Sequence, residues 1–251
     1  MFAFIGHLFT IICYQPLLNL LVATYNFIPG HDIGLVIIIL TILIKLVLYP
    51  FSLSSIKAQK SMNELQPKLN EIKQKYKDDK EKQAKATMEL YKEHKINPLS
   101  SCFPLLIQLP FLIGIYQVFS AGLGNNSDLS LLYPFISNPG HINTIAFGFF
   151  DMAKPAWIIA VLAAAAQYWQ TKMMLTKRPP IKDKGAEDED MAAIMSKQMM
   201  YMMPLMTILI GWNLPAGLVF YWLLLTVFTG LQQLLTIKKT KTLPVEIIDG
   251  K

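Results

Sequence analysis

Long apolar segments alternate with short charged ones along this chain. Four apolar blocks stand out, at residues 33 to 51, 99 to 120, 155 to 173 and 194 to 235. About 20 apolar residues cross the hydrocarbon core of a bilayer as a helix, so each of the first three predicts one span. The fourth is too long for one crossing, and the turn sequence WNLPAG at residues 212 to 217 interrupts it. The pattern therefore predicts five spans, the last two joined by a tight turn.

Residues 1 to 30 allow two interpretations. The segment LFTIICYQPLLNLLVATYNFIPG is long enough to cross a bilayer, but it carries several polar residues and a proline. An amphipathic helix lying in the membrane interface fits as well, and we favour it because it gives the simpler topology. The first residues contain no Lys or Arg, and the bulky Ile12 precedes Cys13. We therefore expect no cleaved signal peptide.

The segment between the first two spans has the pattern of a helical hairpin. One helical face is predicted by apolar residues that recur every three or four positions, namely Met62, Leu65, Leu69, Ile72 and Tyr76. A second face is predicted by Ala84, Met88 and Tyr91. The polar sequence KDDK separates the two faces. We expect two helices joined by a polar turn.

Composition and charge place this pattern in a membrane. Hydrophobic residues make up 53% of the chain, which is rare in soluble domains. Of the 23 Lys and Arg residues, 11 lie between 57 and 95, six between 172 and 197, and four after 235. Residues 1 to 32 and 121 to 154 hold only Lys154. Basic loops stay in the cytoplasm, so we expect the N-terminus outside and the C-terminus inside. The net charge of +6 then needs no nucleic-acid partner.

The predicted fold is an all-α polytopic membrane protein with a five-helix transmembrane core. Its expected parts are an N-terminal interfacial helix (1–30), a first span (31–53), a cytoplasmic charged helical hairpin (54–96), a second span (97–121), an extracytoplasmic loop (122–154), a third span (155–173), a cytoplasmic loop (174–193), a fourth and fifth span (194–235) and a short cytoplasmic tail (236–251).

The residues of catalytic or metal chemistry are scattered. The four histidines show no ligand spacing, the two cysteines are too few for a disulfide framework, and no phosphate-binding or nucleophile motif is present. We expect no enzyme activity, no metal and no cofactor. The spans also lack Asp and Glu at mid-membrane depth, which counts against ion-coupled transport.

Lys45 is the exceptional residue of the first span. A lysine deep in a membrane helix costs at least ~2.5 kcal/mol. Its stem could extend to the cytoplasmic boundary about 9 Å away, or its ammonium could face a wet cavity inside the bundle. Thr41 lies on the same helical face. The other polar or amphipathic candidates within the spans are Gln108, Gln167, Gln170, Tyr221 and Trp222. Each of these alone is explained by bonding between helices or by anchoring at the interface.

Three segments together resemble the YidC/Oxa/Alb family of membrane protein insertases. They are LTILIKLVLYPFSLSSIKAQKSMNELQPKLNEIKQKYKDDKEKQ, LYKEHKINPLSSCFPLLIQLPFLIGIYQVF and MMYMMPLMTILIGWNLPAGLVFYWLLLTVFTGLQQ. The resemblance implies a hydrophilic groove inside the bundle, closed to the outside and open to the cytoplasm and to lipid. Lys45 stands where family members usually carry arginine. Thr41, Gln167 or Gln170, Tyr221 and Trp222 match groove-lining positions, and Gln108 belongs to the family motif LIQLP.

The function implied by the resemblance is the insertion of nascent membrane proteins into the bacterial plasma (inner) membrane. The groove would receive a polar segment, and the substrate helix would leave sideways into the bilayer. The hairpin lysines are expected to recruit substrates or partners, namely Lys57, Lys60, Lys68, Lys73, Lys75 and Lys77. Further candidate partners are the ribosome, the signal recognition particle receptor and the Sec translocon. The short tail and the absence of a large extracytoplasmic domain match the minimal form of the family. The alternatives are a small-solute channel or transporter, and a membrane scaffold.

Overall fold

Helices dominate the computed structural model, which describes residues 2–77, 79–94, 97, 103–121, 129–174 and 191–239. Its elements, in chain order, are α1 (Phe2–Phe9), the π-helical turn η1 (Thr10–Tyr14), α2 (Gln15–Phe27), α3 (Ile33–Val47), α4 (Tyr49–Glu64), α5 (Gln66–Lys75), α6 (Lys80–Glu93), α7 (Phe103–Ala121), β1 (Ile145–Ala146), β2 (Phe150–Asp151), α8 (Trp157–Met174), α9 (Met191–Gly211) and α10 (Ala216–Lys239).

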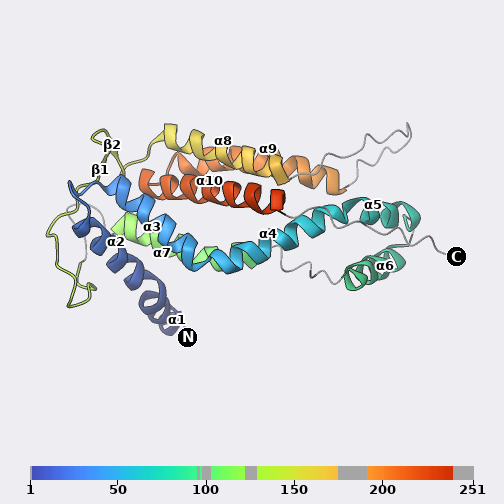
Figure 1. Ribbon diagram of the computed structural model, residues 1–251, viewed down its shortest axis with the longest axis horizontal. Helices are drawn as coiled ribbons and strands as arrows, with labels where there is room; N and C mark the ends of the chain where they lie inside the picture. Colours follow the sequence, from blue (N-terminus) through green and yellow to red (C-terminus); the bar gives the residue numbers. More distant parts are fainter. Residues whose placement is uncertain are drawn as a thin grey trace.

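Helices α3, α7, α8, α9 and α10 form the bundle, and α10 packs against α3, α7 and α8 (Figure 1). The core of the bundle is apolar and includes Ile37, Leu40, Phe119 and Tyr221, all nearly or fully buried. Helices α5 and α6 lie beyond one end of the bundle, and α4 connects them to it (Figure 1). The many exposed Leu, Ile, Met and aromatic side chains of the bundle are those that a lipid environment would cover.

Two helices are both long and apolar enough to cross a membrane within the described residues: Gly6–Phe27, which spans α1, η1 and α2, and Ala216–Thr236 of α10. The bent pair α3 and α4 would add a third. A multi-pass helical membrane protein therefore agrees with the structure. That all five helices of the bundle cross the membrane stays a prediction, and so does the interfacial placement of residues 1 to 30.

The predicted first span is not one straight helix. Helix α3 ends at Val47, and the chain bends by 70° into α4, which begins at Tyr49. Pro50 stands in the first turn of α4. Its ring has no N–H to donate and clashes with the carbonyl group one turn earlier, so a sharp bend is expected there. The helix axis therefore changes direction before residue 53, and the boundary of the first span at that residue stays a prediction.

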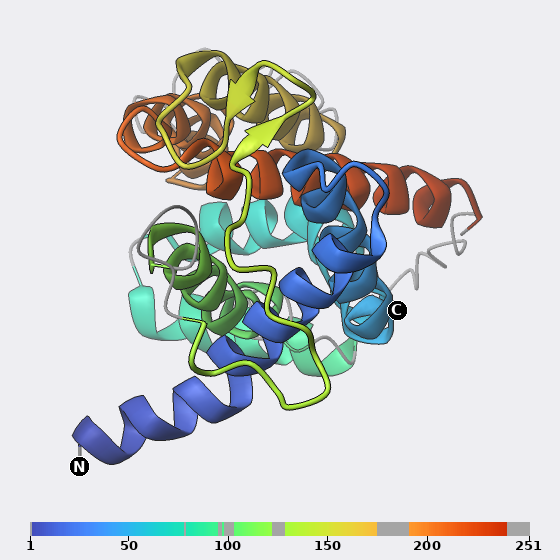
Figure 2. The ribbon, with the colours of Figure 1, turned by 90° about the vertical axis from the view of Figure 1, so that its left-hand side faces the viewer.

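The polar residues of the N-terminal helix are bonded to the loop that precedes β1. The Asn19 side chain accepts the Tyr133 N–H at 2.6 Å and donates to the Leu131 carbonyl at 3.0 Å. About two turns further along α2, Asn26 donates to the carbonyl of Ser137 at 2.7 Å. Figure 2 shows this loop running across α2 at the end of the bundle. The polar face of α2 thus serves contacts within the protein.

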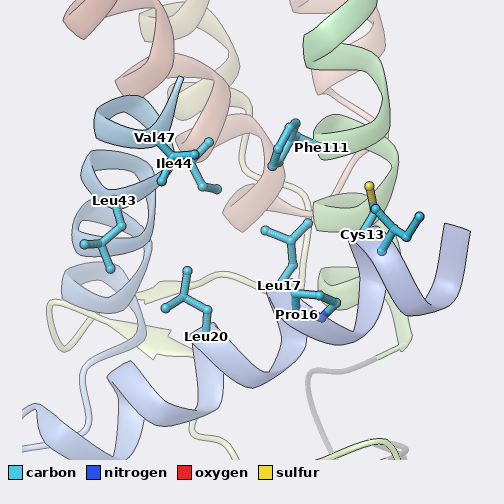
Figure 3. A pocket seen from close by; sticks show the side chains of 9 residues that line it. Cys13, Pro16, Leu17, Leu20, Leu43, Ile44, Val47 and Phe111 are labelled. Atoms are coloured by element: carbon cyan, nitrogen blue, oxygen red, sulfur yellow. The ribbon is translucent and has the colours of Figure 1, made fainter. Parts of the chain in front are cut away.

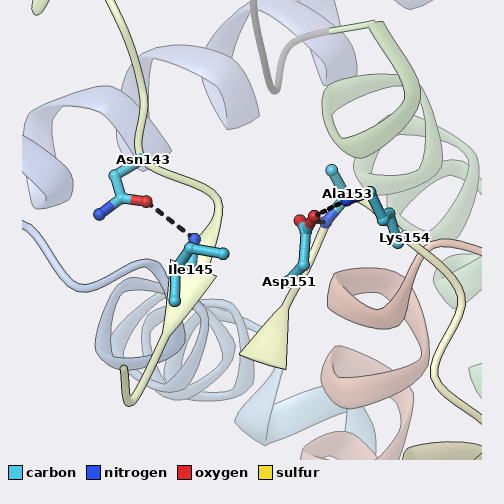
Figure 4. Close-up of polar contacts among 5 residues, drawn as sticks. All are labelled: Asn143, Ile145, Asp151, Ala153 and Lys154. Carbon is cyan, nitrogen blue, oxygen red and sulfur yellow. Dashed lines mark hydrogen bonds and ion pairs between the residues drawn. The ribbon is translucent and has the colours of Figure 1, made fainter. Parts of the chain in front are cut away.

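Strands β1 and β2 form a short antiparallel hairpin. It contacts α3, and the residues just after it bond to the start of α10. The prediction of a purely helical chain missed these strands, whose register pairs Ile145 with Asp151. Beyond the hairpin, Met152 accepts the Gly217 N–H and Lys154 accepts the Ala216 N–H, both at 2.9 Å. Figure 4 shows the side chains that shape the turns on both sides, where Asn143 accepts the Ile145 N–H and Asp151 pairs with Lys154.

Helices α5 and α6 pack against one another, and one of the predicted apolar faces differs. Leu65, Leu69 and Leu90 form a small buried cluster. The predicted residue Met88 is instead 54% exposed, so that part of the second face was wrong. Helix α10 also continues to Lys239, past the predicted end at residue 235. Three predicted segments lie partly outside the described residues. They are the start of the second span (98–102), most of the loop before the fourth span (175–190) and most of the tail (240–251).

Candidate functional site: polar contacts between the helices

The Lys45 side chain turns toward α10. Its ammonium nitrogen, Nζ, donates to Thr229 Oγ1 at 3.0 Å and to Gln232 Oε1 at 3.2 Å. The side chain is half-buried. A snorkelling lysine would direct Nζ to the headgroups, whereas these acceptors belong to a neighbouring helix of the bundle. Lys45 is therefore engaged in polar contacts between helices.

Polar residues follow one face of α10, and two of them contact α3 and α4. Thr229, Gln232 and Thr236 follow at intervals of three and four residues, so they share one face. Ser52 of α4 donates to the same Gln232 oxygen as Lys45, at 2.8 Å. The sequence reading missed these partners of Lys45. The regular spacing of Thr and Gln along an apolar helix was the signal that could have revealed them.

The other predicted groove residues form separate pairs. Gln108 of α7 donates to the hydroxyl of Tyr221 at 2.7 Å, and Tyr221 is fully buried. Gln167 of α8 accepts the hydroxyl hydrogen of the buried Thr207 of α9. Thr41 is fully buried and donates to the Ile37 carbonyl at 2.6 Å within its own helix. Gln170 and Trp222 are half-buried.

These pairs are spread along the bundle. Tyr221 and Gln232 are eleven residues apart on α10, which corresponds to ~16 Å along the helix axis. Lys45 lies near the end of α3, where α4 begins, and Tyr221 lies near the start of α10, which is bonded to the residues that follow β2. Among the described residues, the polar contacts fall into three separate groups, around Lys45, around Tyr221 and around Gln167, rather than into one compact cluster.

An apolar cavity of about 170 Å³ lies on another side of α3 (Figure 3). Residues of η1, α2, α3 and α7 line it, among them Leu17, Leu43, Val47 and Phe111. Leu43 and Val47 are each two residues from Lys45, a separation that turns a helix by about 200°. Because of this opposite orientation and its apolar lining, the cavity is distinct from the polar contacts of Lys45.

The hairpin presents its lysines in two environments. Lys57, Lys75 and Lys77 are exposed, and Lys60, Lys68 and Lys73 are half-buried. Lys60 lies 3.6 Å from Glu64, and Lys68 lies 3.1 Å from Nε2 of His94. At the turn, a hydrogen bond from the Lys82 side chain holds the pKa of Asp79 below its ordinary value. This keeps a negative charge at the start of α6, where it caps the helix.

The fold and these contacts define a class of protein: a multi-pass helical membrane protein with polar contacts between its helices and a charged helical hairpin beside the bundle. Comparison with known proteins identifies the family within this class. A family model described as "60Kd inner membrane protein" matches residues 24–243. A relative from Fusobacterium nucleatum, named membrane protein insertase YidC, is 37% identical over 208 residues, which are 83% of this chain and 87% of that protein.

Longer relatives and one solved structure agree. A membrane protein insertase YidC of Geobacter sp. strain M21 is 32% identical over 88% of this chain, and the match spans only 36% of that longer protein. The crystal structure of an active YidC insertase with its first transmembrane domain resolved matches with a TM-score of 0.50 and 26% identity, over 84% of this chain and 43% of that chain.

The chain therefore belongs to the 60Kd inner membrane protein family, the YidC membrane protein insertases. Its role is that of a membrane protein insertase in a bacterial membrane. The family resemblance read from the sequence is confirmed.

Proposed function

We propose that the chain inserts nascent membrane proteins through a hydrophilic groove between its helices, with Lys45 as the attracting charge. The observation that carries this proposal is the direction of the Lys45 ammonium, which meets Thr229 and Gln232 inside the bundle. A charge held among helices at low dielectric attracts an acidic segment more strongly than a charge in water does. Its polar neighbours lower the cost of bringing such a segment out of water.

In the proposed mechanism the substrate crosses in two stages. A polar, often acidic segment first enters the groove from the cytoplasm and is drawn toward Lys45. The membrane potential assists each negative charge by ~2.3 kcal/mol per 100 mV. The apolar helix of the substrate then moves sideways into lipid, driven by the burial of its own apolar surface. The mechanism makes and breaks no covalent bond, so we propose no enzymatic step, nucleotide or metal.

The remaining groove residues and the hairpin have supporting roles in this proposal. Thr41, Gln108, Gln167, Gln170, Tyr221 and Trp222 contribute polar or amphipathic surface along the path. The hairpin lysines make the first contact with the substrate or with the ribosome, the signal recognition particle receptor or the Sec translocon. The basic segments support a topology with the N-terminus outside and the C-terminus in the cytoplasm.

The test replaces Lys45 in cells depleted of their own insertase. We expect Lys45→Arg to insert a single-span substrate with an acidic external segment, Lys45→Ala to insert it poorly, and Lys45→Glu to insert least. A matched control is Lys172→Glu, the same charge change on an exposed side chain in the last turn of α8. If Lys45→Glu inserted the substrate as well as Lys45→Arg, the electrostatic role would be wrong.

Site-specific crosslinking tests the path separately. A photoreactive residue at Gln167, Gln170 or Trp222 is expected to capture a stalled nascent chain. The same residue at Leu43 or Val47, which line the apolar cavity, serves as the comparison. Capture from the cavity positions alone would place the substrate elsewhere and contradict the proposed groove.

A further inference from the structure

The amide oxygen of Gln232 accepts hydrogen bonds from both sides of a sharp bend. Lys45, near the end of α3, donates at 3.2 Å, and Ser52, in the first turn of α4, donates at 2.8 Å. The two helices are bent by 70° relative to one another. A single side chain of α10 thus holds the lysine-bearing helix and the helix that leads to the cytoplasmic hairpin.

The chemistry of the two donors fixes the orientation of this amide. An ammonium group and a hydroxyl group that both donate require an oxygen, because an amide nitrogen has only hydrogens to present. Turning the amide over would bring its NH₂ group against the Lys45 ammonium. The amide therefore stays with Oε1 toward Lys45 and Ser52. Its Nε2 is left buried without a hydrogen-bond partner among the described residues.

This unpartnered nitrogen shows how strongly the arrangement depends on the oxygen. A buried donor without an acceptor is unfavourable, and rotating the side chain outward would relieve it. Gln232 is nevertheless 9% exposed. Bonds to an ionised donor are among the stronger hydrogen bonds, and they offset the unpartnered nitrogen.

Thr229 supplies a second fixed acceptor one turn earlier on α10. Its hydroxyl donates to the Leu225 carbonyl at 2.6 Å, so its oxygen lone pairs are free to accept from Lys45. The two acceptors are three residues apart and face the same way. Together they define where the ammonium lies, and only Gln232 extends the contact to α4.

We infer that Gln232 is a positioning residue for Lys45 and that it links the lysine to the bend between α3 and α4. This inference deepens the proposed function and rests on it. An acidic segment that draws Nζ away from Gln232 removes one of the two bonds at its oxygen. Gln232 then keeps one of its two donors, Ser52 of α4, and no longer joins α4 to the lysine-bearing helix α3. Engagement of the substrate at Lys45 thereby releases this link across the bend.

The experiment measures the position of α4 and the insertion of substrate in the same variants. Spin labels at Glu64 and Leu235, both exposed, report the distance between α4 and α10 in the full chain, with Cys13 and Cys102 replaced by Ala. Gln232→Met removes the acceptor at similar volume. We expect it to broaden the distance distribution and to lower insertion of an acidic substrate roughly fivefold, the loss expected for one hydrogen bond. Gln233→Met, the same change at the neighbouring buried glutamine, is the control.

Two further variants separate the roles of Gln232. Gln232→Glu keeps acceptor oxygens for both donors, so the distance distribution should stay narrow, whereas insertion should fall as in Lys45→Ala because the new charge neutralises the ammonium. Ser52→Ala should broaden the distance distribution but keep insertion within about twofold of the wild type, because the contact of Lys45 with Gln232 remains. If Gln232→Met does not fold, Ser52→Ala tests the link between α4 and α10 in its place.

The outcomes distinguish this inference from the proposed function. If Gln232→Met behaves like Gln233→Met in both measurements, or if Gln232→Glu broadens the distribution as much as Gln232→Met does, Gln232 does not position Lys45. If Lys45→Ala inserts normally while Gln232→Met still broadens the distribution, the structural link holds and the electrostatic function fails.

Discussion

The Asp32 carboxylate binds the backbone N–H of Phe147 at 2.6 Å through Oδ2. Through Oδ1 it also accepts the N–H groups of Gly34 and Leu35, at 2.7 and 3.1 Å, and so caps α3. One side chain therefore fixes both the start of the helix that bears Lys45 and the turn between β1 and β2. Phe147 has a φ of 54°, a conformation that costs free energy for a residue with a side chain. The bond from Asp32 helps to hold it.

Replacing Asp32 with Ala should destabilise this end of the molecule by about 2 kcal/mol, the upper range for loss of an N-terminal cap. Asp32→Asn keeps an oxygen for the cap but offers Phe147 an amide nitrogen, so it should free the turn selectively. Hydrogen exchange measures both effects. We expect Asp32→Asn to speed exchange at Phe147 and to spare α3, and equal protection in the wild type and Asp32→Asn would contradict the role of Oδ2.

Gly34 lies at a close contact between α3 and the β hairpin. A methyl group at this position would lie 2.6 and 2.7 Å from two ring carbons of Phe147. Gly34→Ala should therefore push the hairpin away and cost about 1–3 kcal/mol, as overpacking does elsewhere. Gly6→Ala is the control, because its methyl group meets nothing within 4 Å. The measurement is the unfolding midpoint in detergent, and equal midpoints for the two variants would show that the hairpin adjusts at no cost.

Local patterns in the sequence predicted most of the helices. They could not predict the contacts between one helix and another. Short-range spacing predicted a break at residues 212 to 217, and the structure ends α9 at Gly211 and begins α10 at Ala216. The β hairpin was missed because its strands have two residues each, too short for an alternating pattern. The bend before Pro50 was missed because the apolar stretch continues through it, although proline is a known cause of bends.

The candidate site shows the same division. Lys45 was recognisable because a charge in an apolar helix is costly wherever its neighbours lie. Its partners Thr229 and Gln232 depend on the rotation of α10 against α3, which no local pattern reports. The matching positions of the family placed several polar residues in one groove, whereas the described contacts distribute them over separate helix pairs.

The packing of α5 against α6 can be tested directly with one buried and one exposed apolar residue. Leu90 is buried against Leu65 and Leu69, whereas Met88 is largely exposed. Leu90→Ala should cost about 2 kcal/mol, at the lower end for a core leucine because the cluster is small. Met88→Ala should change stability by less than about 0.5 kcal/mol. Limited proteolysis of the full chain reads out the hairpin, and equal cleavage rates for both variants would restore the face predicted from the sequence.

Asp151 makes the β hairpin sensitive to acid. Burial raises the pKa of this carboxyl group, but hydrogen bonds from Lys154, Thr144 and the Ala153 N–H, together with the Lys154 charge, lower it below its ordinary value. The stabilisation is therefore present above the unfolded pKa of about 3.9 and is lost as the pH falls through the folded pKa. Asp151→Asn should lower the unfolding midpoint at about pH 6, and this difference should shrink as the pH falls below about 3.9. A constant difference across this range would rule out the linkage.

The pair of Gln108 and Tyr221 connects α7 to α10 in the apolar interior, and its bond length of 2.7 Å indicates a good hydrogen bond. Such bonds in membrane proteins average ~0.6 kcal/mol and reach about 1.7 kcal/mol, because the separated helices find other partners. A double-mutant cycle with Tyr221→Phe and Gln108→Leu should give a coupling free energy in this range. The fully buried Tyr221 touches a substrate only after the two helices separate, so Tyr221→Phe should weaken the contact and ease that separation. Additive single-mutant effects would mean that the two side chains do not act as a pair.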